Sequence, residues 1–521
     1  MDTGFDLTVE VPGCPDASER IERRLRETVD ELIRFVRQDA DERRLLDFEQ
    51  ALRAWIALLF RLCVALFLAG RHQRLDVRAR LVEGWRVKRE FALRTIKTLY
   101  GPVRYGRAYL TRGSGSGWFP LDAALGITQD GFSWGVIDVV TRLATRVSYS
   151  AARGIFKAML GWAPSTEAIE LLAIGLGNRA PAFMETFGPL EKDGEVLIIE
   201  VDGKAAPMAT EEELEARRRK RKHASGCSCG CQRHRGRQRR HGKEKKRKKR
   251  GHNSKNGRSA TLVAMYTLRR GADGRLHGPI NKKIWGQFGC RKDMLQWARD
   301  QATRRGFGPD TDHRIQIVLD GERCLRKELQ ILFPRATFTL DLRHSQERLW
   351  KVGRLFYAEG SKELEQCVEP LNMLLLSGRV GALLKQLREM LAQIPLHGPN
   401  TKMKREEIQS QLAFFEARRD IMRYDEYRRE DLVLATGVIE GACRYVVKER
   451  LDCAGMRWSL EGAERLLQLR CIELNGDWEA FITSASDETT QELVAGKVVK
   501  LRHQKPKPSS RASPKPAASV V

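Results

Sequence analysis

Several features that mark specialised classes of protein are missing from this sequence. Its most apolar stretch, residues 54–70 (AWIALLFRLCVALFLAG), carries Arg61 near its centre. A charge at the centre of a bilayer costs about 3 kcal/mol or more, so we expect a buried helix there, not a membrane span. Residues 1–10 are acidic and polar, unlike the start of a signal peptide. The 11 cysteines are odd in number and scattered, which does not indicate a disulfide framework. These absences predict a cytoplasmic protein.

Aromatic residues are also few, at 7%, but 42% of the residues are hydrophobic, which excludes a wholly disordered chain. A chain of this length forms roughly two to four domains. The formal net charge of +26 is spread unevenly. Residues 217–252 hold 18 Lys and Arg against one acid, Glu244, and residues 496–521 hold seven against none. The sequence therefore predicts a nearly neutral globular body with two basic appendages.

The first third of the chain mixes helical and strand patterns. Residues 18–96 carry apolar residues at helical spacing with dense charge pairs. Residues 95–99 and 103–109 are rich in β-formers around a Gly-Pro pair, as in a hairpin. Residues 150–160 and 165–176 then outline two helices separated by a short break. This pair is either a DNA-reading helix–turn–helix or plain helical packing, and the second helix is not basic.

From residue 194 onward, apolar runs of strand length alternate with helical patterns. The resulting order, β-β-β-α-β-α-β-α, is the layout of the ribonuclease H-like fold, a mixed five-stranded sheet with helices. The chain as a whole is thus expected to be α+β or α/β. Strands are expected at residues 196–201, 260–268, 283–288, 314–319 and 337–342, and helices at 292–304, 322–332, 344–430 and 436–451.

Composition and pattern divide the chain into six expected segments. They are a helical N-terminal region (1–93), a β-hairpin with a helical DNA-end-binding region (94–190), the N-terminal portion of the ribonuclease H-like core (191–343) with a basic loop (211–257), a helical insertion (344–434), the C-terminal portion of that core (435–495) and a disordered basic tail (496–521).

Acidic residues stand where this layout brings chain segments together. Asp202 follows the first predicted strand, Asp320 follows the fourth, and Glu440 lies on the last helix. Carboxylates held close together repel one another, and a divalent cation offsets that repulsion. All-oxygen ligands select Mg²⁺ or Mn²⁺, and two such ions about 3.5–4 Å apart clamp a scissile phosphate. Singly, each acid is more often a turn residue or a surface acid. Their joint order indicates a two-metal site.

Seven stretches of the chain are distinctive enough to compare with known families. They are RTIKTLYGPVRYGRAYL (94–110), FPLDAALGI (119–127), EVDGKAAPM (200–208), IVLDGE (317–322), TFTLDLRHSQERLW (337–350), GVIEGACRYVVKERLDCAGMRWS (437–459) and GAERLLQLR (462–470). They resemble DDE transposases of bacterial insertion sequences, in particular the ISKra-type group and, more distantly, Mutator-like elements. The resemblance spans residues 90–475.

The resemblance implies roles for individual residues. Asp202, Asp320 and Glu440 correspond to the family's acidic triad, which holds two Mg²⁺ or Mn²⁺ ions. Asp341 and His344 match the family's [C/D]-x-x-H element after the fifth strand. His344 would position a phosphate or orient a water, or else pack on the sheet.

Two further residues of the same stretches have open roles. Arg444 lies four residues after Glu440, on the same helical face, and either holds a DNA phosphate or forms an ordinary salt bridge. Trp458 either stacks on an unpaired base or belongs to the core.

The basic loop departs from the family pattern. Its like charges prevent it from folding alone, and beside an active site they would neutralise DNA phosphates without reading the sequence. Within it, Cys227, Cys229 and Cys231 are flanked by His223 and His234. The C-x-C-x-C spacing is tighter than that of usual structural Zn²⁺ sites, so this cluster is either a zinc site or a set of free thiols.

Taken together, these features predict a DNA transposase. It would bind the terminal inverted repeats of its element and the target DNA, act as a homodimer or larger assembly, and reside in the cytoplasm at the nucleoid, away from any membrane. Two alternatives remain open. One is a nuclease or resolvase on the same fold, which cuts without joining. The other is a domesticated, non-catalytic DNA-binding protein.

Overall fold

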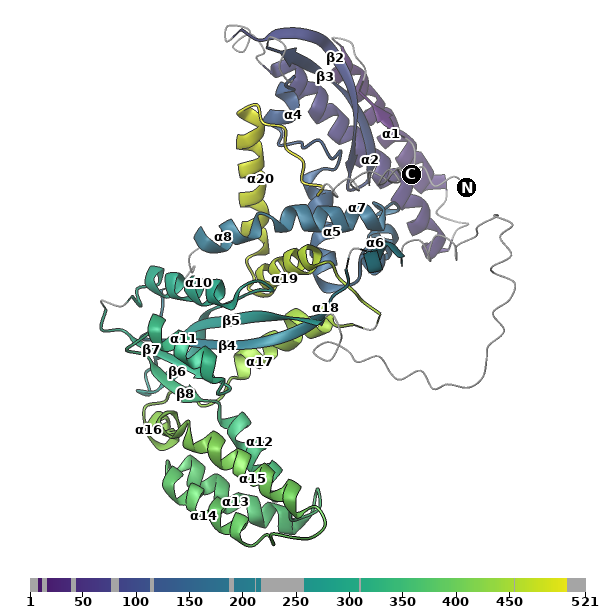
Figure 1. Cartoon of the computed structure of the whole chain (residues 1–521). Coiled ribbons are helices and arrows are strands. Elements are labelled where there is room, and N and C mark those ends of the chain that lie inside the picture. Colours follow the sequence, from purple (N-terminus) through teal and green to yellow (C-terminus); the bar gives the residue numbers. More distant parts are fainter. Residues whose placement is uncertain are drawn as a thin grey trace, which may run out of the picture. The chain divides into compact units, whose positions relative to one another are not determined.

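The computed structural model describes residues 8–11, 16–38, 44–75, 84–112, 117–186, 192–210, 212–216, 257–308, 311–453 and 455–503. The chain divides into two compact units, here called the first and second units (Figure 1). The first unit contains Met1–Arg179 and Ile482–Val521, and the second contains Ala180–Phe481.

The first unit combines a small sheet with helices. The sheet has the order β1 (Val9–Glu10), β3 (Gly101–Thr111), β2 (Arg86–Thr98), with β2 antiparallel and β1 parallel to β3. The helices are α1 (Ala17–Gln38), α2 (Leu45–Arg74), α4 (Pro120–Ala124), α5 (Trp134–Arg146), α6 (Tyr149–Leu160) and α7 (Thr166–Gly177). Helix α20 (Trp478–Val494) begins in the second unit and ends in the first.

Strand β2 corrects the sequence-based expectation of a helix over residues 18–96, which is wrong from residue 86 onward. Most of β2 is exposed, so it lacks the apolar alternation by which a half-buried strand is recognised. Its conformation depends on pairing with β3, from Arg86 opposite Thr111 to Thr98 opposite Gly101. The strand conformation of residues 86–98 is therefore determined by pairing with β3 and not by the local sequence pattern.

Helix α2 contains the most apolar stretch of the chain. By length and composition alone, its residues Leu45–His72 could cross a membrane. Its buried residues Leu62, Ala65 and Leu68 pack with β3 residues in the core of the first unit. Arg61 is buried among them and donates from Nε to the carbonyl of Ala57 (3.0 Å). One side of α2 thus belongs to this core, while 28% of its most apolar window is buried and Ile56 and Phe67 are exposed.

Helices α6 and α7 are the pair for which a DNA-reading role was one interpretation. Ser148 and Ser165 cap them, each accepting a hydrogen bond from the backbone N–H three residues on. Nearly every residue of α7 from Leu171 to Gly177 is buried. A recognition helix needs an exposed face, so the placement of α7 fits the other interpretation, plain helical packing.

The start of the predicted disordered tail packs on the first unit. Val499 and Leu501 are buried, and the N–H of His503 donates to the carbonyl of Leu171 in α7 (3.0 Å). The expectation of disorder is therefore wrong for residues 496–503, because Val499 and Leu501, two of their three apolar side chains, are buried. Residues 504–521 lie outside the described part of the chain.

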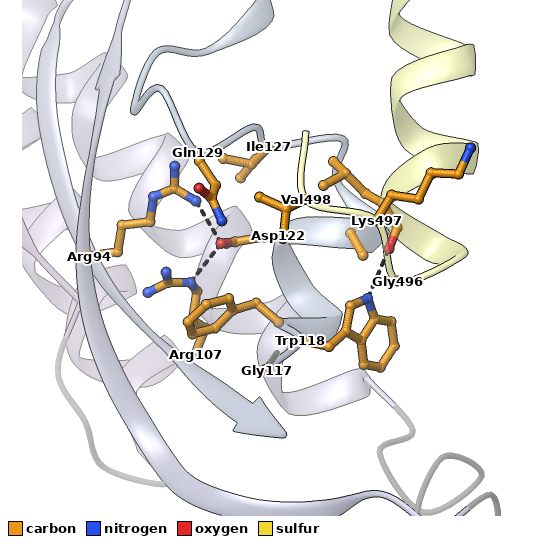
Figure 2. Close-up of a pocket in the computed structure, with 13 residues that line it drawn as sticks. Arg94, Arg107, Gly117, Trp118, Asp122, Ile127, Gln129, Gly496, Lys497 and Val498 are labelled. Atoms are coloured by element: carbon orange, nitrogen blue, oxygen red, sulfur yellow. Dashed lines mark hydrogen bonds and ion pairs between the residues drawn. The ribbon is translucent and has the colours of Figure 1, made fainter. Parts of the chain in front are cut away.

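A buried ion cluster fixes the hairpin of the first unit to the segment after it. The carboxylate of Asp122 accepts hydrogen bonds from Arg94, Arg107 and Tyr105, each at 2.6 Å. Figure 2 shows the two guanidinium groups, Arg94 above and Arg107 below, both directed at the same carboxylate oxygen. They line a half-open pocket of roughly 260 Å³. The cluster joins residues 94–110 to 119–127, the two N-terminal stretches noted in the sequence.

The second unit is built on a mixed five-stranded sheet, ordered β6-β5-β4-β7-β8. Strands β4, β5 and β6 pair antiparallel, and β7 and β8 continue parallel to β4. The bounds are β4 (Val196–Pro207), β5 (Gly257–Arg270), β6 (Leu276–Gln287), β7 (Arg314–Leu319) and β8 (Thr337–Leu340). All five predicted strands are present, and β4 runs beyond Asp202 instead of ending there. The layout is compatible with the ribonuclease H-like arrangement.

Helices follow the strands in the predicted order. Helix α17 and the π-helical turn after it contact β4, while α10 contacts β5 and α19 contacts β6. The bounds are α8 (Ala180–Thr186), α10 (Arg291–Arg304), α11 (Arg323–Leu332), α12 (Leu342–Gly353), α17 (Gly437–Ala442), the π-helix (Cys443–Lys448), α18 (Glu449–Leu451) and α19 (Leu460–Leu474).

Residues 344–434 form the helical insertion, which gathers beside β8 (Figure 1). Tyr424 and Tyr427 donate their hydroxyl protons to the carbonyls of Leu340 and Phe338 (both 2.9 Å), so the insertion satisfies some of the backbone acceptors at the outer edge of β8. Its helices after α12 are α13 (Lys362–Leu376), α14 (Val380–Ala392), α15 (Thr401–Glu416) and α16 (Tyr424–Arg429), with a 3₁₀ turn at Arg419–Ile421.

Candidate metal centre

The register of the parallel strands places three aspartates in one row. Continued to the carboxyl ends of the strands, the pairing of β4 with β7 aligns Asp202 with Asp320, and the pairing of β7 with β8 aligns Asp320 with Asp341. The backbone N–H of Asp341 donates to the carbonyl of Leu319 (2.9 Å), so the ladder reaches this row. Aligned residues point to the same face, and neighbouring strands lie about 4.8 Å apart. The register thus brings the three aspartates to the same edge of the sheet.

Asp341 is the buried end of the row and is held by several donors. Its carboxylate accepts from the N–H of Arg343 (2.8 Å), from Nδ1 of His344 (2.7 Å) and from the hydroxyl of Thr436. Burial raises the pKa of Asp341, but the hydrogen bonds from His344 and Thr436 outweigh it, and the pKa falls below its usual range. Asp341 is therefore a carboxylate at neutral pH.

His344 stands between Asp341 and Glu440. The hydrogen bond to Asp341 raises the pKa of His344 to about 9, against the opposing effect of burial, and Asp320 adds to the rise. Its Nδ1 also lies 3.8 Å from Oε1 of Glu440. The imidazole is therefore protonated at neutral pH and links the strand carboxylates to the helix carboxylate.

Glu440 is positioned by the start of α17. The N–H of Ile439, one residue earlier, donates to Oε2 of the buried Glu200 (2.8 Å), and Tyr266 donates to Oε1 of the same carboxyl (2.7 Å). Burial is the largest cause that raises the pKa of Glu200 to about 7, with Asp341 and Glu440 adding to it. Glu200 in β4 thus holds the start of α17 through a hydrogen bond to its backbone.

Sequence reasoning missed Glu200 as a positioning residue. It was treated only as a member of an apolar strand, VLIIEV, and of the EVDG stretch. Its apolar neighbours in VLIIEV predict that Glu200 is buried. Because a buried carboxyl requires hydrogen-bond partners, this position could have been recognised as one that contacts another element.

Asp202 carries an unexpected partner. The buried thiol of Cys443, in the π-helical turn, donates to Oδ2 of Asp202 (3.2 Å). Burial, then the charge of Asp202, raises the pKa of Cys443, so this thiol stays protonated. Helices with a π-turn often occur at functional sites. Here the turn brings a donor from the Glu440 helix onto Asp202.

The structure identifies a possible metal-binding group. Ligand atoms of Asp341, His344 and Glu440 all lie within 4.8 Å of one another. Among the described residues, no other set of three His, Cys, Asp or Glu side chains has its ligand atoms this close together. Asp202 and Asp320 do not belong to the group. The trio Asp202, Asp320 and Glu440 therefore stays a prediction. The strand register aligns Asp202 with Asp320, and Glu440 lies close to Asp341.

The donor set fits a hard divalent cation. Within the group, the carboxylates of Asp341 and Glu440 offer oxygen ligands of the kind that Mg²⁺ and Mn²⁺ prefer. His344 donates from Nδ1 to Asp341 (2.7 Å) and belongs to the same group of possible ligands.

The accessory residues lie on the same chain segment as Glu440. Arg444 is exposed and donates from Nε to Glu449 (3.2 Å), the ordinary salt bridge among its two interpretations. Trp458 is buried, donates to the carbonyl of Leu451 (2.8 Å) and lies under Arg450 (5.0 Å), which fits a core tryptophan. The candidate zinc ligands Cys227, Cys229, Cys231, His223 and His234 lie outside the described residues.

Comparison with known proteins adds no family to this geometry. No family model matches the chain, and no curated protein matches it.

Proposed function

We propose that the protein is a DNA transposase of the DDE type, built on a ribonuclease H-like catalytic domain. The observation that carries the proposal is the row of Asp202, Asp320 and Asp341 across β4, β7 and β8, with Glu440 brought to its end by α17. Acidic residues gathered at one sheet edge suit two-metal phosphoryl transfer. Seven sequence stretches that resemble DDE transposases support the same activity.

In this proposal the carboxylates hold Mg²⁺ or Mn²⁺, which when bound activates the attacking oxygen and stabilises the leaving oxygen. The chain's own residues fix the geometry. Strands β4 and β7 hold Asp202 and Asp320 rigidly, and Glu200 holds the helix that carries Glu440. Protonated His344 keeps Asp341 ionised and places positive charge beside the site. The same pocket would serve water in end cleavage and a 3′-hydroxyl in strand transfer.

The partners follow from this activity. The protein would bind the terminal inverted repeats of its element and the target DNA, and two ends must meet, so a homodimer or larger assembly belongs to the proposal. The 18 Lys and Arg of residues 217–252 would supply sequence-independent phosphate contacts. Its place would be the cytoplasm, at the nucleoid.

Strand transfer with oligonucleotides copied from the ends of the element tests the proposal. Wild-type protein in Mg²⁺ or Mn²⁺ is expected to release a 3′-hydroxyl and join it to a target duplex, and Glu440→Gln is expected to do neither. Glu449→Gln, an exposed acid on the same helical segment, serves as the matched control for the loss of one charge. Cleavage without joining would favour the nuclease or resolvase, and DNA binding by wild type without cleavage would favour the non-catalytic binder.

A further inference from the structure

Three arginines gather beside Asp320, and the candidate metal centre does not use them. Arg418 donates from Nε to the carbonyl of Gly321, the residue after Asp320 (2.7 Å). Arg348 and Arg418 both stack on the ring of Phe414, with guanidinium carbons 3.4 and 3.8 Å from its centroid. Two groups so close to one centroid must lie on opposite faces of the ring. We call Arg323, Arg348 and Arg418 the Asp320 arginine cluster.

The cluster holds more positive charge than its surroundings neutralise. Burial first, and then the charges of Arg323 and Arg348, lower the pKa of Arg418 to about 10, against the opposing effect of Asp320. Arg348 donates to the neutral side chain of Gln411 (2.9 Å), with Glu407 and Glu347 acting on it only at longer range. Arg323 is exposed, and no side-chain partner is found for it in the portion of the chain that the structure describes.

Neighbouring arginines outside the cluster are already paired. Arg326 binds Asp420 with two nitrogens, and Arg291 binds Glu322 (2.6 Å) and Glu328 (3.0 Å). Asp320 is then the acid whose charge acts most on Arg348 and Arg418. Because Asp320 is itself a candidate metal ligand, its charge is committed to a cation when the site is loaded. The cluster keeps a net positive charge in either state, because one carboxylate does not neutralise three guanidinium groups when the site is empty and contributes less when a cation is bound.

We propose that Arg323, Arg348 and Arg418 bind a backbone phosphate of the DNA strand being cut, next to the phosphate that reacts at the acidic row. Guanidinium groups match phosphate oxygens, and Arg348 and Arg418 keep donors that their present hydrogen bonds do not use. Phe414 holds both groups in place. This inference rests on the proposed function for the identity of the reacting strand.

The inference also assigns a role to the helical insertion. Arg348 comes from α12, Phe414 from α15, and Arg418 from the segment after α15. Gly321 has φ +94°, and a Cβ there would lie 2.6 Å from Nε of Arg418, so the sheet edge and the insertion meet closely at this residue. The insertion thus carries cationic groups to the catalytic edge of the sheet.

DNA binding without divalent ions tests the cluster separately from catalysis. The full chain is titrated into a fluorescent 30-base-pair duplex of arbitrary sequence, in EDTA, at several KCl concentrations. Arg323→Gln is expected to weaken binding and to reduce the slope of log K against log [KCl] by about 0.9, the value for one lost phosphate contact. Arg323→Lys keeps the charge and is expected to keep the slope.

Arg335→Gln is the matched control, because Arg335 is an exposed arginine just before β8, at the opposite end of the strand from Asp341. Arg418→Gln, checked for an unchanged thermal midpoint, extends the test to the buried side of the cluster. If Arg323→Gln and Arg335→Gln have the same slope as wild type, the cluster does not bind phosphate, whatever the catalytic result. If wild type never cleaves but the slopes differ as expected, the cluster stands and the proposed function fails.

Discussion

At the scale of single residues, buried charges are the most consequential features of both units. A buried carboxylate that loses its charge leaves its cationic partners buried and unpaired, which costs more than the pair itself contributes. In the first unit Asp122 is the one acid at the centre of three donors. Burial first, and then the charge of Asp122, raises the pKa of Tyr105, so that hydroxyl remains a donor.

Asp122→Asn is therefore expected to destabilise the first unit by about 3–5 kcal/mol, because Arg94 and Arg107 keep their charges in a buried site. Chemical denaturation followed by tryptophan fluorescence measures the change. Glu90→Gln removes a charge from an exposed position of β2 and is expected to shift the midpoint little. Equal midpoints for the two variants would contradict the account.

Asp193 gives the second unit a pH-dependent contribution. Burial opposes its ionisation, but hydrogen bonds from Arg305 and Asn281 prevail and lower the pKa of Asp193. A carboxyl whose pKa is lower in the folded state stabilises that state above its unfolded pKa, and the contribution disappears as the pH falls through the folded value.

Asp193→Asn is expected to destabilise the protein by about 2 kcal/mol at pH 7. The difference from wild type should shrink once the pH falls below 3.8, the ordinary value for this carboxyl. Urea midpoints of the two proteins over a pH series give the measurement. A difference that stays constant down to the lowest folded pH would show that the ion pair with Arg305 is not the cause.

At the scale of elements, the sequence predicted what depends on local pattern and missed what depends on a partner. Strand β7 has its predicted bounds because a short apolar run before Asp-Gly is unambiguous. The hairpin around Gly101 was predicted, but β2 was expected only from residue 95, and its start at Arg86 was missed because that part of the strand is exposed and paired with β3. The alignment of Asp341 with Asp202 and Asp320 follows from strand register, which a sequence does not specify across a long insertion such as residues 211–257. Asp341 was expected from the family resemblance only as an accessory residue.

The contact between α7 and the C-terminal segment is another feature of this kind. A Cβ on Gly175 would lie 1.3 Å from the carbonyl oxygen of Leu501, so only glycine allows the close approach. Gly154 in α6 is also helical, but nothing lies within 4 Å of a Cβ there. The two glycines therefore form a matched pair for substitution by alanine.

Gly175→Ala is expected to displace residues 499–503 from α7 and to expose them to limited proteolysis. Gly154→Ala should leave the cleavage pattern unchanged and stabilise α6 by about 0.5–1 kcal/mol, the usual gain from replacing a helical glycine. Mass spectrometry of the early fragments reports the outcome. Resistance of the tail in Gly175→Ala would mean that the segment tolerates a shift of its backbone.

At the scale of the whole molecule, most of the net positive charge lies outside the described body of the second unit. Most of the +26 net charge lies in residues 217–252 and in the C-terminal tail, whereas the described body of the second unit supplies the acidic row and the arginine cluster. In the proposed function, long-range attraction to DNA and local positioning of a phosphate would thus be carried by different segments of the chain, which can be removed separately.

The pairing of Pro207 with Gly257 makes that separation practical, because β4 and β5 meet as an antiparallel hairpin on either side of the basic segment. Replacing residues 217–252 by a neutral Gly/Ser linker is expected to leave the thermal midpoint of the second unit unchanged.

In this variant, affinity for duplex DNA should fall, and the dependence of log K on log [KCl] should become much less steep, because many phosphate contacts are lost. At low salt and saturating DNA, metal-dependent cleavage should persist, since the acidic row is untouched. Loss of cleavage with normal folding would place residues 217–252 in the reaction itself.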